Sequence, residues 1–366
     1  MKILTIIGIC SLVSVVLLAC GSGGTGLPPD DSNANSNNGG GASGGGAGSS
    51  TGGTGSGGGN SSSSGTASGA GSSGSSGGQA SGGPAAASDA GVSVPQNNPE
   101  IDYASIKTLA MDTFTVPSNG EVYKCQDFAN PWGKQVDIKT YVLDMAAGSH
   151  HMFAFYKSGA TNGPVGDCPS GGLEFGPFTF TSQQHEISQT YPATVGATIP
   201  QGTGFTLMVH YLNTSQAPVD SHVVLTMAIA KPAAVTQHAG VLYLDNTSMI
   251  VAPGVSTSTK SYTLPQDVQI LSTWSHMHQQ ATRFISSASS GETLFTTTEW
   301  AEPPAKPYSP PLALKSGTSI TWSCTYDNVT NQTLTFGQSA KTNVMCISLS
   351  VFYPVADPSN PVIGIP

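Results

Sequence analysis

The feature that most constrains this chain is a series of short apolar segments separated by proline and glycine. The segments are rich in Val, Ile, Thr, Phe and Tyr, and helical periodicity is hard to find among them. Segments of this length and composition are typical of strands in antiparallel sandwiches. The clearest ones are YKCQDF, VDIKTYVLDM, HMFAFY, GFTLMVHYLN, VVLTMAIA, VQILSTW, SITWSCTY, TLTFGQ and CISLSVFY. We therefore predict an all-β fold.

These segments occupy residues 99–366, a length that suits two domains better than one. A Lys231-Pro232 break follows VVLTMAIA and places a domain boundary near residue 235. We predict two antiparallel β-sandwich domains, residues 99–235 and residues 236–366.

The N-terminus has the pattern of a bacterial export signal. Lys2 precedes an apolar run that ends in Leu17-Leu18-Ala19-Cys20, and the run is short for a membrane-spanning helix. The end of the run resembles the lipobox of bacterial lipoproteins. We predict a signal peptide over residues 1–19 and a lipid on Cys20, and Gly21 favours the outer membrane, with the body in the periplasm or at the cell surface. An ordinary secretory peptide is the alternative.

Residues 20–98 are predicted to be a disordered, lipid-anchored linker. Residues 21–98 hold three charged side chains, no aromatic residue, and mostly Gly, Ser, Asn and Ala. Such a segment cannot bury enough apolar surface to offset its ordering entropy, and it would span on the order of 50 Å. The formal net charge of the chain is −9. This charge argues against nucleic-acid binding and leaves the lipid anchor as the predicted membrane contact.

Four cysteines follow the anchor, at Cys125, Cys168, Cys324 and Cys346. In an oxidising compartment an even number indicates disulfides, and four cysteines allow three pairings. Pairing within the predicted domains is the simplest of the three. Free cysteines that bind a metal are the alternative.

Five histidines stand in short clusters within SHHMF, MVHYLN and SHMHQQ. Alternate residues of a strand share a face, so His276 and His278 converge while Met277 points away and packs. His150 and His151 are adjacent, so both can reach one metal only at a bend or bulge. The preceding Gly148-Ser149 could supply it.

These residue types point to copper. His150, His151 and His210 would make an all-nitrogen site, and His276, His278 and Met345 would make a site with one sulfur. Imidazole with thioether suits copper, because Met favours Cu(I). Two unlike sites indicate electron storage at one and oxygen chemistry at the other. Each residue alone also has a structural interpretation, as a core or surface side chain, and His185, His222 and His238 are predicted to be surface or structural residues.

Together the clusters resemble the copper type II, ascorbate-dependent monooxygenases, the family of peptidylglycine α-hydroxylating monooxygenase and dopamine β-monooxygenase. The matching stretches, in order, are VYKC at 122–125, SHHMFAFY at 149–156, LMVHYLN at 207–213, SHMHQQATRF at 275–284, SCTYDN at 323–328 and VMCISLSVFYP at 344–354. The resemblance implies two jelly-roll-like sandwiches with a solvent-filled cleft between two copper ions. It also implies the disulfides Cys125–Cys168 and Cys324–Cys346.

By the same resemblance, His150, His151 and His210 would bind an electron-transfer copper. His276, His278 and Met345 would bind the oxygen-activating copper and form the catalytic site. The implied reaction hydroxylates an activated C–H bond of a small-molecule substrate with O2 and ascorbate or another one-electron reductant.

The chain departs from the family at several positions. Trp274 stands where the peptide-amidating members have an arginine for the substrate carboxylate, and Val344 stands where the family usually has Glu. Peptide amidation is therefore not expected, and the surroundings of Trp274 and Leu349 favour a neutral or aromatic substrate. The alternatives are a non-catalytic copper-binding or surface recognition lipoprotein and, third, a carbohydrate-active sandwich. The last needs a carboxylate pair that the sequence does not indicate.

Overall fold

The structure is a computed structural model, and it describes residues 93–169 and 176–364. The predicted signal peptide, Cys20 and nearly all of the predicted linker lie outside these residues. Within them the chain is all-β: strands follow one another from β1 to β24, and the short 3-10 helix η1 (Tyr103–Ser105) is the one helical element. The all-β prediction is confirmed. No helix in the described ranges has the length and apolar character needed to cross a membrane.

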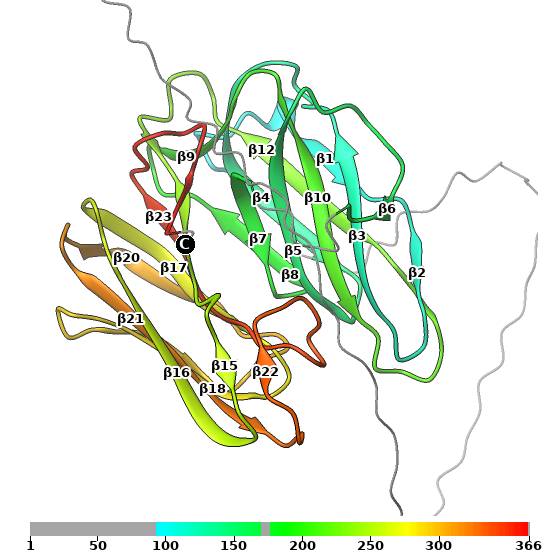
Figure 1. The fold of residues 1–366 in the computed structure, drawn as a ribbon. Helices are drawn as coiled ribbons and strands as arrows, with labels where there is room; N and C mark the ends of the chain where they lie inside the picture. Colours follow the sequence, from blue (N-terminus) through cyan, green and yellow to red (C-terminus); the bar gives the residue numbers. More distant parts are fainter. Residues whose placement is uncertain (1–92, 170–175, 365–366) are drawn as a thin grey trace, which may run out of the picture. The chain divides into compact units, whose positions relative to one another are not determined.

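Two large sheets are built from the first half of the chain (Figure 1). The six-stranded sheet has the order β1 (Lys107–Ala110), β12 (Val223–Ile229), β4 (Val136–Met145), β9 (Val195–Ile199) and β13 (Gln237–His238), with β8 (Glu186–Thr190) also paired to β4. The five-stranded sheet has the order β6 (Gly166–Asp167), β3 (Glu121–Phe128), β10 (Thr203–Leu212), β5 (Ser149–Ser158) and β7 (Phe178–Ser182). A small ribbon joins β11 (Val219–Ser221) to β2 (Phe114–Val116).

The second half of the chain builds two further sheets. The sheet that we call the central sheet has the order β20 (Lys306–Leu314), β17 (Val268–Met277), β23 (Cys346–Tyr353), β14 (Gly240–Asp245) and β24 (Val362–Ile363). The other sheet has the order β16 (Gly254–Thr263), β21 (Ser319–Asn328), β18 (Ala281–Ala288) and β19 (Thr293–Thr297), and a small ribbon joins β15 (Ile250–Val251) to β22 (Leu334–Thr335).

Strand β21 shows why these segments are strands. Every second residue is buried, from Ile320 through Trp322, Cys324 and Tyr326 to Asn328, and the residues between them are more exposed. This period of two places one face of the strand on a core and the other face toward solvent. The buried face packs in a core with residues of the central sheet.

Strands β17 and β23 of the central sheet are buried on both faces, which positions the functional site. On β17, Met277 packs in the core of the second half, whereas Trp274 packs in a core cluster that also contains first-half residues such as Phe153. On β23, Cys346 packs in the core of the second half, and Ile347 packs in the cluster that also contains first-half residues. Side chains on one face of β17 and β23 therefore meet the five-stranded sheet of the first half.

Residues at the predicted domain limits pack onto the body. Val94, inside the predicted linker, is buried in a small cluster with Ile101 and Val142, so the ordered body begins before residue 99. Strand β13 lies just after the predicted boundary at residue 235 and still pairs with β9 of the first half. The division into two domains stays a prediction.

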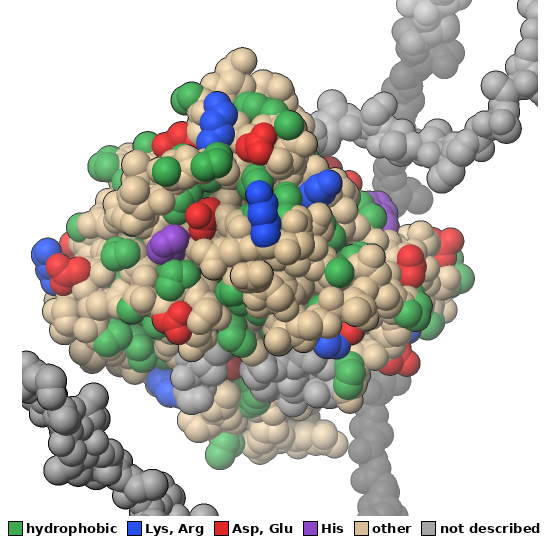
Figure 2. Space-filling model, turned by 90° about the horizontal axis from the view of Figure 1, so that it is seen from above, with side chains coloured by type: hydrophobic (Ala, Val, Ile, Leu, Met, Phe, Trp, Pro, Cys, Tyr) green, Lys and Arg blue, Asp and Glu red, His purple; other side chains and the backbone are tan. Residues whose placement is uncertain are grey.

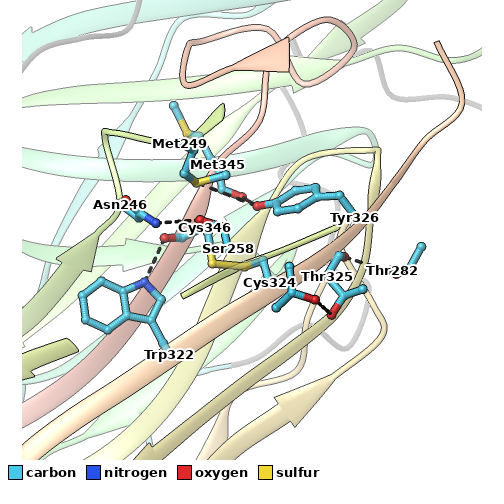
Figure 3. Close-up of a disulfide and its surroundings, with 11 residues drawn as sticks. Asn246, Met249, Ser258, Thr282, Trp322, Cys324, Thr325, Tyr326, Met345 and Cys346 are labelled. Carbon is cyan, nitrogen blue, oxygen red and sulfur yellow. Dashed lines mark hydrogen bonds between the residues drawn. A yellow bond between two sulfur atoms is a disulfide. The ribbon is translucent and has the colours of Figure 1, made fainter. Parts of the chain in front are cut away.

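Both predicted disulfides are present, Cys125–Cys168 and Cys324–Cys346. The second joins β21 to the start of β23 (Figure 3). Around it, Trp322 Nε1 donates to the Cys346 carbonyl at 3.1 Å, and the Tyr326 hydroxyl donates to the Met345 carbonyl at 2.9 Å. These bonds hold the backbone at Met345 in place.

Candidate metal centre

A β-bulge brings both adjacent histidines of β5 to the same place. In the pairing of β5 with β10, His151 lies opposite His210 and Ser149 lies opposite Tyr211, so His150 is the extra residue of the bulge. Gly148, just before, has a φ of +88° that favours glycine. The expected bulge is confirmed, and the rings of His150 and His151 both lie near His210, each with a centroid separation of 5.1 Å.

The other two histidines lie at the end of β17 in the central sheet, His276 within the strand and His278 just after its last residue. His276 lies opposite Ile347 and Met277 lies opposite Cys346. His278 and Met345 are the residues just beyond this end of the paired strands. Met277 is fully buried in the core on the other face. The sequence-based assignment of Met277 as a packing residue is therefore confirmed. Met345 is buried as well, in the core that faces the first half.

The structure joins the two predicted histidine sets into one group, which we call the histidine cluster: His150, His151, His210, His276 and His278. The ring of His276 lies 4.8 Å from that of His150 and 5.0 Å from that of His151, centroid to centroid. All five side chains are buried. The solvent-filled cleft expected between the two sets is therefore wrong for this structure, because the rings from the two halves are in contact.

His150 lies with the second predicted set as well as the first. One ring nitrogen from each of His150, His276 and His278 lies within 4.8 Å of the other two, a spacing that three ligands of one metal ion can have. Sequence reasoning grouped His150 only with His151 and His210. The difference arises because the bulge at His150 turns its ring toward the central sheet.

Every member of the cluster has a buried ring nitrogen without a hydrogen-bond partner among the described residues. These atoms are Nε2 of His150, His276 and His278 and Nδ1 of His151 and His210. A buried polar atom that stays unpaired costs roughly 1–3 kcal/mol, so five together call for a ligand. Imidazole nitrogens gathered in this way are typical metal ligands.

Gln183 determines which nitrogen of His276 is free. Its amide nitrogen donates to the carbonyls of Trp300 at 2.7 Å and Ala301 at 3.1 Å, so its oxygen must face the other way. That oxygen lies 2.9 Å from His276 Nδ1, which must therefore carry the proton. Nε2 of His276 is left with its lone pair inside the cluster.

His278 and His210 are oriented by other partners. His278 Nδ1 donates to the Asn343 carbonyl at 3.2 Å, which leaves Nε2 free. His210 Nε2 donates to Glu121 Oε1 at 2.9 Å, which leaves Nδ1 free, and Tyr123 stacks on the His210 ring at 3.9 Å. Bonds of this kind set the tautomer and the orientation of metal-binding histidines.

Burial keeps the cluster uncharged. It lowers the pKa of His150, His151, His210 and His276 well below the ordinary value of 6.5, and it lowers the pKa of His278 to about 3. Neighbouring imidazoles lower these pKa values further. Neutral imidazole is the form that binds a metal, so the cluster needs no deprotonation near neutral pH.

Sequence reasoning missed Gln183, Glu121 and Asn343, which carry no metal-type motif of their own. It placed the remaining histidines correctly outside the cluster. His185 pairs with Glu302 at 3.0 Å, His222 lies near Asp144 and is about half exposed, and His238 bonds to Thr198.

No family model matches the chain, and no curated protein matches it. Among solved structures, it is similar to the major capsid protein P2 of bacteriophage PM2, at 8% sequence identity and a TM-score of 0.30, with 68% of this chain and 96% of that chain covered. It is also similar to the VP2 subviral particle of infectious bursal disease virus, at 11% identity and a TM-score of 0.17, with 74% and 77% covered. TM-scores this low support no conclusion about activity.

Proposed function

We propose that this chain is a copper-dependent monooxygenase that hydroxylates an activated C–H bond with O2 and an external one-electron reductant such as ascorbate. The observation that carries the proposal is the histidine cluster, in which five buried, neutral imidazoles each keep an unpartnered nitrogen. The order of the motifs supports the same reading, because the stretches that resemble the copper monooxygenases are those that contribute the cluster and Met345.

The donor set fits copper. Five imidazoles and the buried thioether of Met345, just beyond the same end of the paired strands as His278, offer nitrogen and soft sulfur, which suit Cu(I) and Cu(II) better than they suit hard cations. We propose two copper ions. One would be held by Nδ1 of His151 and His210, and the other by Nε2 of His276 and His278 with the sulfur of Met345. The ring of His150 lies near the rings of both His210 and His276.

The protein's own groups would prepare this centre before any metal arrives. Gln183 and the Asn343 carbonyl hold the Nδ1 protons of His276 and His278, so the ligand nitrogens point inward. Glu121 does the same for His210 through Nε2. Bound copper would supply the one-electron chemistry and the position for O2. Burial of all five rings keeps bulk water from the centre.

A test separates this function from the alternative of a non-catalytic copper-binding protein. The full-length chain is loaded with copper, desalted, reduced with ascorbate and incubated under 18O2 with a panel of neutral aromatic compounds. We expect two coppers per chain by elemental analysis and copper-dependent 18O in one product by mass spectrometry. His276→Ala should lose the product, and His222→Ala, an exposed histidine outside the cluster, should keep it. Two bound coppers with no labelled product would favour the binding protein, and no bound copper would refute both.

We also propose that the chain is a lipoprotein of the bacterial outer membrane, anchored through Cys20. The support is the Leu17-Leu18-Ala19-Cys20 end of the apolar run and the two disulfides, which fit an oxidising compartment. On the face drawn in Figure 2, Lys and Arg side chains are scattered among Asp and Glu and form no basic patch. Cys20→Ser should lose the lipid adduct by mass spectrometry, and an unchanged adduct would refute the anchor.

A further inference from the structure

A cleft of about 310 Å³ lies beside the histidine cluster. Its walls come from β4, β7 and β8 of the first half and from β17, β20 and β23 of the second. This volume is at the lower end of the range of roughly 300–1,000 Å³ found for small-molecule sites. The cleft contains none of the five histidines, so it is distinct from the metal centre.

The cleft and the histidine cluster share a wall. Every second residue of β17 points to the same face, so Ser272, Trp274 and His276 share one face. Neighbours among these three lie about 6.7 Å apart along the strand. Ser272 and Trp274 line the cleft, whereas Trp274 and His276 line a cavity of about 10 Å³ that also reaches His151. Such a cavity holds about one water molecule.

Four residues line both the cleft and this cavity, namely Thr181, Ser182, Gln183 and Trp274, and they form the wall between the two spaces. Gln183 is also bonded to His276. A molecule in the cleft would therefore touch the indole of Trp274 and the amide of Gln183, which adjoin the histidine cluster.

The lining determines which molecules fit. Among the described residues that line the cleft, Glu186 is the one that is charged, and it is exposed. No Lys, Arg or His of the described ranges lines the cleft, so a carboxylate or phosphate would find no cation there. Trp274, Tyr141 and Pro307 offer flat apolar surface, and Gln189 and Ser272 offer hydrogen bonds.

We propose that this cleft is the substrate site and that it takes a neutral molecule with one or two flat rings and a polar substituent, while it rejects anions. The role as substrate site rests on the proposed monooxygenase function. The preference for neutral ring compounds over anions rests on the lining alone.

Two matched probes test the preference, 3-methylindole, which is neutral, and indole-3-acetate, which is its anionic analogue at pH 7.5. Calorimetry on the full-length chain should show that 3-methylindole binds at least about tenfold more tightly than indole-3-acetate. The reason is that the indole-3-acetate anion loses hydration beside the carboxylate of Glu186. Equal affinities, or no binding of either probe, would overturn the proposal.

Variants locate the binding. Glu186→Lys changes an exposed rim residue, and it should tighten binding of indole-3-acetate about tenfold. Asp327→Lys, a change at another exposed residue, on β21 in a different sheet, should leave the affinity for both probes unchanged. Val351→Trp, which fills the cleft, should weaken the binding of 3-methylindole. An unchanged anion affinity in Glu186→Lys would overturn the assignment of the cleft.

The copper measurements keep the two proposals apart. If the probes discriminate as expected and the chain binds no copper, the monooxygenase function fails and the binding site stands. If copper and labelled product are found but Glu186→Lys has no effect on the anion, the cleft is refuted as the substrate site and the monooxygenase function stands.

Discussion

Glu121 accepts a hydrogen bond from His210 Nε2 at 2.9 Å, and the same carboxylate holds the segment that leads to Met345. Its Oε1 accepts from the backbone nitrogen of Ala340 at 2.6 Å, and its Oε2 accepts from the Ser339 hydroxyl at 2.7 Å. One side chain of β3 thus connects a histidine of the first half to the loop before β23. Nearby, the Tyr123 hydroxyl donates to the carbonyl of Gln338 at 2.7 Å.

Removal of the Glu121 carboxylate should weaken copper binding. Glu121→Ala leaves His210 free to adopt the other tautomer, and partners of this kind typically contribute 10–100-fold to metal affinity. We expect a loss of about that size in a competition titration with a copper chelator. Glu121→Gln keeps an acceptor oxygen for His210 and should restore most of the affinity. Glu302→Ala removes the partner of His185, outside the cluster, and serves as the control. A similar loss in Glu302→Ala would contradict the role given to Glu121.

His150 and His151 should differ in which copper they affect. His151→Ala removes a ligand opposite His210, so we expect one of the two coppers to be lost while sulfur scattering from the other remains. His150→Ala removes a nitrogen that lies within 4.8 Å of those of His276 and His278, so it should alter the sulfur-bound copper. X-ray absorption on the reduced protein reports both. Identical spectra for the two variants would show that the bulge does not direct His150 toward the central sheet.

Met345 is expected to be the sulfur ligand. Met345→His should keep two coppers but lose the copper–sulfur scattering, and oxygen-dependent turnover should fall with it. Met277→Leu changes the methionine on the opposite face of β17, and it should keep the scattering and cost less than about 1.5 kcal/mol of stability. If the signal disappears in Met277→Leu, the strand-face argument is refuted.

Asp245 should make stability depend on pH. Burial raises the pKa of this carboxyl from 3.8 to about 7, and its Oδ1 has no partner among the described residues. Between these two pH values the folded state keeps a proton that the unfolded state has released. The unfolding free energy therefore falls as pH rises, by up to about 1.4 kcal/mol per pH unit from this group. Above pH 7 the loss is complete.

Asp245→Asn removes that titration. Denaturant titration gives the unfolding free energy of the variant and of the natural chain. The value of the variant minus that of the natural chain should rise from pH 5 to pH 8. Asp267→Asn, which changes an exposed carboxyl that pairs with Lys315, should show no such gain. A difference that stays constant with pH would show that Asp245 does not titrate in this range.

Much of the fold and part of the site follow from local sequence patterns. The alternation in SITWSCTY predicts β21, and the spacing of His276 and His278 predicts that both rings share a face while Met277 packs behind them. The adjacent pair His150 and His151 requires a bulge if both are to meet. These inferences succeed because the direction of a side chain on a strand depends only on its nearest neighbours in the chain.

The contact between the two histidine sets was decided by tertiary structure. His150 and His276 lie 126 positions apart in the sequence, and they meet because one face of the central sheet packs against the first-half sheet. Gln183 and Glu121 belong to the site for the same reason. Gln183, from the first half, bonds to Trp300 and His276 of the second half, and Glu121 bonds to His210 and to the backbone of Ala340. A strand pattern indicates which residues are buried, but it does not say which sheet covers them. The sequence by itself therefore determined the strands and the metal-type residues, and packing between sheets decided that these residues form one cluster with a cleft beside it.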